Sequence, residues 1–131
     1  MKRILIVDDE PNMRRVLKLY LERAGYAVAT CCNGQEALDA IRNGEPDALV
    51  TDIKMPVMSG KDLCLALDER MPDRAFPIFI MTSMTDREHR EWINCISNLY
   101  FLEKPLSMRM LEQKLRKCFE AEAAMGEHDH V

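Results

Sequence analysis

The fold is decided by the stretch Asp47-Ala-Leu-Val-Thr-Asp-Ile-Lys-Met-Pro-Val-Met-Ser-Gly60. Ala48 to Thr51 form a short apolar run closed by turn signals, which predicts a buried β-strand. Pro56 has no N–H to donate to a strand ladder, so the strand must end before it. Ser59 is a preferred N-cap residue, which predicts that a helix begins directly after it. Asp52 is therefore expected at the end of a buried strand, on a surface loop with a rigid base.

Four further apolar runs predict strands at Ile4–Val7, Tyr26–Cys31, Pro77–Met81 and Leu99–Leu102. Helical periodicity follows each strand, with helices expected to begin near residues 11, 33, 60, 85 and 107. Strands that alternate with helices indicate parallel βαβ units with right-handed crossovers. We therefore predict an α/β fold: a doubly wound, three-layer α/β/α sandwich around a five-stranded parallel sheet of order 2-1-3-4-5, as in flavodoxin-like folds.

The chain has 131 residues, and its length and composition indicate one ordinary globular domain. We expect this domain to span residues 1–120, with residues 121–131 as a C-terminal tail or linker stub. The net charge of −4 and the lack of a basic stripe argue against nucleic-acid binding by this segment. Five cysteines without a C-x-x-C spacing predict reduced thiols that pack as small apolar residues. With no signal peptide and no membrane-length apolar run, the expected location is the cytoplasm.

Polar residues follow four of the five predicted strands: Asp8 and Asp9, Asp52, Thr82, and Lys104. The carboxyl ends of parallel strands lie on one edge of a sheet, and neighbouring strands are about 5 Å apart. Three carboxylates so close together repel one another unless a cation is bound. Mg²⁺ prefers oxygen ligands and commonly takes one or two carboxylates plus phosphate oxygens. This edge of the sheet is therefore a candidate metal and phosphate site.

The same residues suit the transfer of a phosphoryl group. Asp52, kept ionised, is a nucleophile, while Lys104 offers a positive charge to an incoming phosphate. The Thr82 hydroxyl can donate to a phosphoryl oxygen. Each residue alone has an ordinary structural explanation, such as helix capping or a turn. Their joint placement at four strand ends is what favours phosphoryl transfer, which depends mainly on positioning and charge neutralisation.

From about Lys2 to Phe119, the sequence resembles the receiver domain of the two-component response-regulator family. The residues that carry the resemblance are the acidic pair Asp8-Asp9, the acceptor motif Asp52–Gly60, the strand-four pair Thr82-Ser83, and Lys104-Pro105. One departure is Ser97-Asn98, which replaces the Gly-Ala common before strand five and predicts a different loop shape.

The resemblance implies that Asp52 accepts a phosphoryl group from a histidine kinase or a histidine phosphotransfer protein. It implies that Asp9, Asp52 and the Lys54 backbone carbonyl bind Mg²⁺ or Mn²⁺, with Asp8 acting through water. Thr82 takes the place of the switch hydroxyl and Phe101 that of the switch aromatic. Lys54 and Met84 stand at the two variable positions that tune the lifetime of the phosphoryl group in this family.

The resemblance also implies a partner surface for a downstream effector or a second copy of the chain. That surface would combine the helix from Asp86, the strand Leu99–Leu102 and the helix from Met108. No effector domain follows Phe119, which slightly favours a single-domain regulator over a receiver cut from a longer protein.

Three alternative functions stay open at this point. An aspartate-nucleophile phosphatase typically has a second Asp two residues after the first, where this chain has Lys54. A flavodoxin needs a Ser-, Thr- and Gly-rich first loop for the flavin phosphate, whereas Asp8-Asp9-Glu10 would repel it. A receiver-like module that binds partners without phosphorylation usually lacks the acidic pair or the lysine, and this chain retains both.

Overall fold

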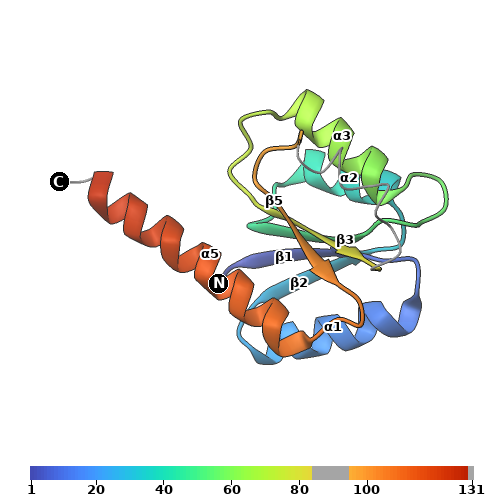
Figure 1. The fold of residues 1–131 in the computed structure, drawn as a ribbon, viewed down its shortest axis with the longest axis horizontal. Helices are drawn as coiled ribbons and strands as arrows, with labels where there is room; N and C mark the ends of the chain where they lie inside the picture. Colours follow the sequence, from blue (N-terminus) through green and yellow to red (C-terminus); the bar gives the residue numbers. More distant parts are fainter. Residues whose placement is uncertain (84–94, 130–131) are drawn as a thin grey trace.

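The computed structural model describes residues 1–83 and 95–129 as five strands and four helices (Figure 1). The strands are β1 (Arg3–Val7), β2 (Ala27–Cys31), β3 (Ala48–Asp52), β4 (Ile78–Thr82) and β5 (Leu99–Glu103). The helices are α1 (Pro11–Arg23), α2 (Gly34–Asn43), α3 (Gly60–Arg70) and α5 (Met108–Asp129). All strand pairs are parallel and the sheet order is β2-β1-β3-β4-β5, which confirms the predicted fold class. The helix predicted near residue 85 lies outside the described residues.

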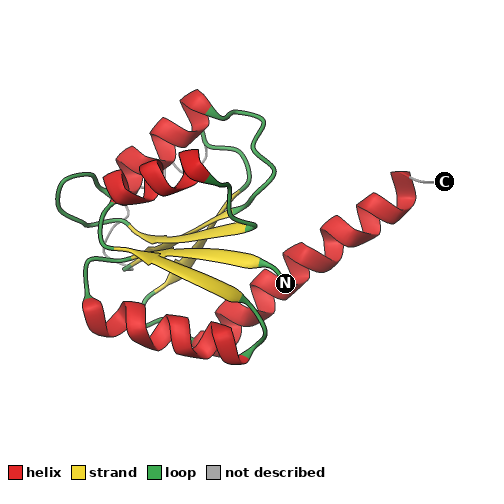
Figure 2. Cartoon of the chain, turned by 180° about the vertical axis from the view of Figure 1, so that it is seen from behind, coloured by secondary structure: helices red, strands yellow, loops and turns green. Residues whose placement is uncertain are grey.

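The sheet separates two apolar cores. Helices α2 and α3 cover one face of the sheet, and α1 and α5 cover the other (Figures 1 and 2). Strand β1 shows how the sequence builds both cores, because successive side chains of a strand point to opposite faces. Leu5 and Val7 pack in the core under α2 and α3, while Ile4 and Ile6 pack in the core under α1 and α5. A continuous apolar run is therefore what this central strand requires.

The four predicted helix starts that fall within the described residues, near residues 11, 33, 60 and 107, are present in the structure. Pro11 lies in the first turn of α1, where its missing N–H costs nothing. The Asn33 side chain accepts a hydrogen bond from the Glu36 N–H at 2.9 Å, and caps α2. The Ser59 hydroxyl caps α3 by accepting from the Asp62 N–H at 3.1 Å. These caps fix where each helix begins relative to the strand end before it.

Helix α5 is longer than the sequence pattern predicts. The apolar periodicity ends at Phe119, but the helix continues to Asp129 and projects beyond the sheet (Figure 1). Residues 121–124 are exposed, so this part of the helix has no buried face. Its sequence, Glu-Ala-Glu-Ala-Ala from Glu120 on, consists of strong helix formers, and intrinsic propensity extends a helix that packing has already nucleated. The division into a receiver unit of residues 1–120 and a tail remains a prediction.

All five cysteines are free thiols. Cys31 and Cys64 are buried, as predicted for small core residues, and burial raises their pKa to about 11 and about 12. Both are therefore protonated at neutral pH. Cys95 is exposed, so the expectation that the cysteines fill the core is wrong for this residue. Within residues 1–83 and 95–129, no helix combines the length and apolar character needed to cross a membrane.

Candidate functional site

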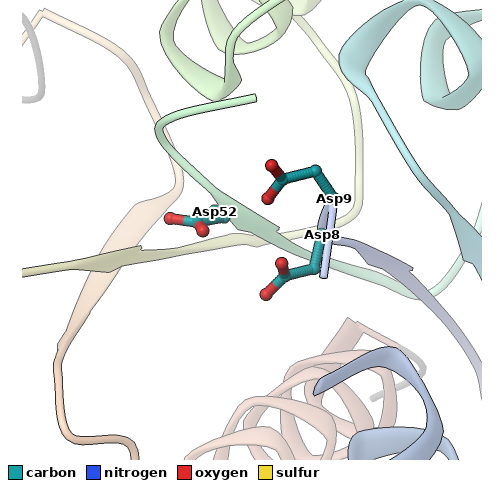
Figure 3. A group of neighbouring side chains, drawn as sticks. All are labelled: Asp8, Asp9 and Asp52. Carbon is teal, nitrogen blue, oxygen red and sulfur yellow. The ribbon is translucent and has the colours of Figure 1, made fainter. Parts of the chain in front are cut away.

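Three carboxylates meet where β1 and β3 end (Figure 3). Asp8 and Asp9 follow β1 directly, and Asp52 is the last residue of β3, which pairs with β1. One oxygen from each carboxylate lies within 4.8 Å of the others. The strand order therefore brings together the acidic residues that the sequence places far apart. Their oxygen donors are of the kind that hard divalent cations prefer.

Asp8 is the buried member of this cluster, with 2% of its surface exposed. Its Oδ1 atom accepts a hydrogen bond from the Glu10 N–H at 2.9 Å. Burial raises the pKa of Asp8 above its ordinary value, and the charges of Asp52 and Asp9 raise it further. The Glu10 hydrogen bond and the charge of Lys104 oppose this rise without cancelling it. The negative charges of the cluster therefore repel one another, and a bound cation would remove this repulsion.

Asp52 is paired on its other side with Lys104. The Nζ atom of Lys104, which follows β5, donates to Asp52 Oδ2 at 3.1 Å. Asp52 Oδ1 accepts from the Ile53 N–H at 2.7 Å. Both oxygens of the Asp52 carboxylate are therefore hydrogen-bonded. The side chain is 14% exposed and can still be reached from solvent.

The remaining predicted site residues lie around this pair. Thr82 is almost buried, and its hydroxyl donates to the Ser83 carbonyl at 3.0 Å instead of reaching Asp52. Phe101, on β5 opposite Ile80 of β4, is 39% exposed. Met84 lies outside the described residues, so the structure does not place it.

Lys54 belongs to a loop, residues 53–59, whose far end is tightly turned. The Met58 N–H donates to the Pro56 carbonyl at 2.7 Å, which closes a three-residue turn around Val57. Val57 has φ 67°, a left-handed conformation that is unusual for a β-branched residue. The Met58 carbonyl in turn accepts from the Gly34 N–H of α2 at 3.0 Å.

Arg14 is a residue at the site that the sequence analysis missed. Its guanidinium donates to the Asp8 carbonyl at 2.7 Å, while the Asp8 N–H donates to the Cys31 carbonyl at 3.1 Å. The acidic turn is therefore held by its main chain as well as by its side chains. The sequence signal for this role is weak, since a basic residue in the first turns of a surface helix is common.

Asp8→Asn is expected to stabilise the metal-free protein at pH 7 by about 1 kcal/mol, because it removes a buried charge from beside two others. A raised pKa means that the folded state holds the proton more tightly than the unfolded state. Stability therefore falls as pH rises from the ordinary value of 3.8 through the folded pKa of Asp8, and the loss persists at neutral pH. Urea unfolding with EDTA at pH 7 measures the difference.

Asp9→Asn is the matched control for this experiment, because Asp9 is exposed and its charge is solvated. We expect it to change the unfolding free energy less than Asp8→Asn does. A loss of stability in the Asp8 variant at pH 7 would contradict the conclusion that the buried Asp8 charge destabilises the metal-free protein.

The family model for the response regulator receiver domain matches residues 4–116. A probable transcriptional regulator, ycf27 of Guillardia theta, is 33% identical over 115 residues, which make up 88% of this chain and 44% of that protein. The alkaline phosphatase synthesis transcriptional regulatory protein PhoP of Bacillus subtilis is 31% identical over 115 residues, or 88% of this chain and 47% of that protein. The chain thus spans about half the length of the curated relatives it matches.

Solved structures show the same architecture. The chemotaxis response regulator CheY4 of Vibrio cholerae superposes with a TM-score of 0.81 at 29% identity, covering 90% of this chain and 98% of that one. The signal receiver domain of a signal transduction histidine kinase from Syntrophus aciditrophicus gives a TM-score of 0.84 at 29% identity, covering 92% of each chain. The edge of the sheet that carries the carboxylates therefore belongs to a widely shared architecture.

Proposed function

Since the chain belongs to the response regulator receiver domain family, we propose that it is a phospho-accepting switch in which Asp52 is the acceptor. The observation that carries this proposal is the Asp52 carboxylate itself, fixed by Lys104 on one side and adjoined by Asp8 and Asp9 on the other. A partly exposed carboxylate with a lysine ammonium beside it suits a nucleophile that receives a negatively charged group.

The reaction would begin with attack by an Asp52 carboxylate oxygen on the phosphorus of a phosphohistidine. The donor would be a histidine kinase or a histidine phosphotransfer protein. An O–P bond forms and the N–P bond breaks, so that the electron pair leaves with the imidazole nitrogen. Asp52 then carries an acyl phosphate, and Lys104, which pairs with the carboxylate at 3.1 Å, is placed to pair with its new negative charge.

The donor set of the cluster fits Mg²⁺ or Mn²⁺, since it consists of carboxylate oxygens close together. We assign direct ligation to Asp9, Asp52 and the Lys54 backbone carbonyl, with Asp8 acting through water. When bound, such an ion neutralises the carboxylates and the phosphoryl oxygens as charge shifts during transfer. Asp8 and Asp9 would thereby hold the ion next to the Asp52 carboxylate.

The switch would use Thr82 and Phe101. An acyl phosphate offers the Thr82 hydroxyl a charged acceptor, which is stronger than the Ser83 carbonyl that it contacts now. Turning the hydroxyl toward phosphate would free space for the partly exposed Phe101 ring. The surface altered in this way includes β5 and α5 and would serve an effector or a second copy. Lys54 and Met84 would set how long the phosphoryl group lasts.

A small phosphodonor tests the proposed function directly. Acetyl phosphate with Mg²⁺ should add a single phosphate to the protein by intact mass, and EDTA should prevent the addition. Hydroxylamine should remove the phosphate, as expected for an acyl phosphate, and peptide mapping should place it on the peptide that contains Asp52. Phosphate that is stable to hydroxylamine, or labelling that does not need the metal, would contradict the proposal.

A further inference from the structure

The N-terminus of α2 lies against the loop that carries Lys54. Gly34, the first residue of α2, is buried, and its N–H donates to the Met58 carbonyl at 3.0 Å. A Cβ atom at Gly34 would lie 2.7 Å from that carbonyl oxygen and 2.8 Å from Met58 Cγ. Both distances are shorter than real Cβ contacts, so this close approach requires glycine.

The end of α2 that holds the loop is itself rigid. The Asn33 side chain accepts from the Glu36 N–H at 2.9 Å. The Glu36 carboxylate reaches back to accept from the Cys32 N–H at 3.1 Å and from the Cys32 thiol at 2.9 Å. Backbone donors on both sides of the cap are therefore satisfied, which fixes the direction of the Gly34 N–H.

Two hydrogen bonds hold the loop. The Gly60 N–H donates to the Ile53 carbonyl at 2.7 Å, which joins the two ends of the loop next to Asp52. Within the loop, the Met58 carbonyl, which follows the turn around Val57, accepts the hydrogen bond from α2. In the sequence, the main chain of Lys54 lies between these two hydrogen-bonded residues, Ile53 and Met58.

We propose that Gly34 is a positioning residue for the metal site: by holding the Met58 carbonyl it would fix the loop of residues 53–59, and with it the Lys54 carbonyl that the proposed function assigns to the metal. The inference rests on the proposed function, in which the Lys54 carbonyl binds the metal. Helix α2 contributes none of the ligands assigned above, but through the loop it would fix the position of one of them, the Lys54 carbonyl. Outer residues that orient metal ligands commonly change affinity by about tenfold or more when altered.

Gly34→Ala tests this inference. We expect the dissociation constant for Mg²⁺, measured by calorimetry, to rise about tenfold. In the metal-free protein, the NMR amide signals of residues 53–59 should shift, since the added methyl group must displace the Met58 carbonyl. Both measurements are made at a temperature at which the variant is folded, so that a loss of stability alone would leave the affinity of the folded protein unchanged.

Gly44→Ala is the matched control, because Gly44 caps the other end of α2. Its φ of 172° is extended, and an added Cβ would approach only the Arg3 guanidinium, at 3.6 Å. It should leave Mg²⁺ affinity unchanged. Asn33→Ala, which weakens the cap without a clash, should raise the dissociation constant in the same direction by a smaller factor, and it decides the question if Gly34→Ala fails to fold.

The outcomes separate this inference from the proposed function. A wild-type protein that binds no Mg²⁺ would overturn the metal assignment and the inference with it. A wild-type protein that binds Mg²⁺, with equal affinity in Gly34→Ala and Asn33→Ala, would overturn the role of Gly34 alone. Unshifted amide signals in residues 53–59 of a folded Gly34→Ala would do the same.

Discussion

Asp52→Asn is expected to abolish phosphorylation by acetyl phosphate, with no added mass above background. The substitution keeps the size and shape of the side chain, and its Oδ1 can still accept from the Ile53 N–H. It removes the anionic oxygen that would attack phosphorus, and a neutral amide oxygen is a far weaker nucleophile. The amide also gives Lys104 no charged partner. Intact-mass measurement over a time course decides the result.

Asp62→Asn is the control for this substitution. Asp62 is exposed on the first turn of α3, close to Asp52 in sequence but outside the acidic cluster. Its variant should be labelled like the wild type. Asp52→Asn should also be folded, because it keeps the size of the side chain and the hydrogen bond from the Ile53 N–H. Labelling of Asp52→Asn at the wild-type rate would place the acceptor on another residue.

The sequence predicted the sheet well because each strand is a short apolar run closed by polar or turn residues. The strand that ends at Asp52 was expected to stop at Thr51, and the structure extends it by one residue. The order of the strands then turns positions in the sequence into neighbours in space. That step is why the nearness of Asp8, Asp9 and Asp52 was predictable without any local signal that joins them.

Contacts between loops were not predictable in the same way. The Gly34 hydrogen bond to Met58 joins two segments that no sequence periodicity relates. Arg14 donates to a main-chain carbonyl, and every residue type has one, so the sequence does not indicate its partner. The direction of the Thr82 hydroxyl depends on competing acceptors within reach, and only a structure resolves that competition. The length of α5 was not predicted because the prediction relied on apolar periodicity. Helix propensity alone extends α5 beyond its buried face.

Gly60→Ala is expected to have the largest effect on stability, a loss of about 3 kcal/mol or more. A Cβ at Gly60 would lie 1.9 Å from the Asp52 carbonyl oxygen, 2.9 Å from its carbonyl carbon and 3.0 Å from Ile53 Cα. These are main-chain atoms, which cannot turn aside as a side chain does. The Gly60 N–H bond to the Ile53 carbonyl at 2.7 Å shows how closely α3 begins against the end of β3.

Because the two closest atoms that this methyl group would displace belong to Asp52 itself, phosphorylation should fall together with stability. The loss of stability in the three glycine variants should then depend on how closely each added Cβ approaches its nearest neighbour. Gly60→Ala meets Asp52 at 1.9 Å, Gly34→Ala meets a loop carbonyl at 2.7 Å, and Gly44→Ala meets a flexible side chain at 3.6 Å. Urea midpoints should fall most for the first, less for the second, and stay close to wild type for the third. If Gly60→Ala matched Gly44→Ala, the acceptor strand and α3 could not be packed as tightly as the structure has them.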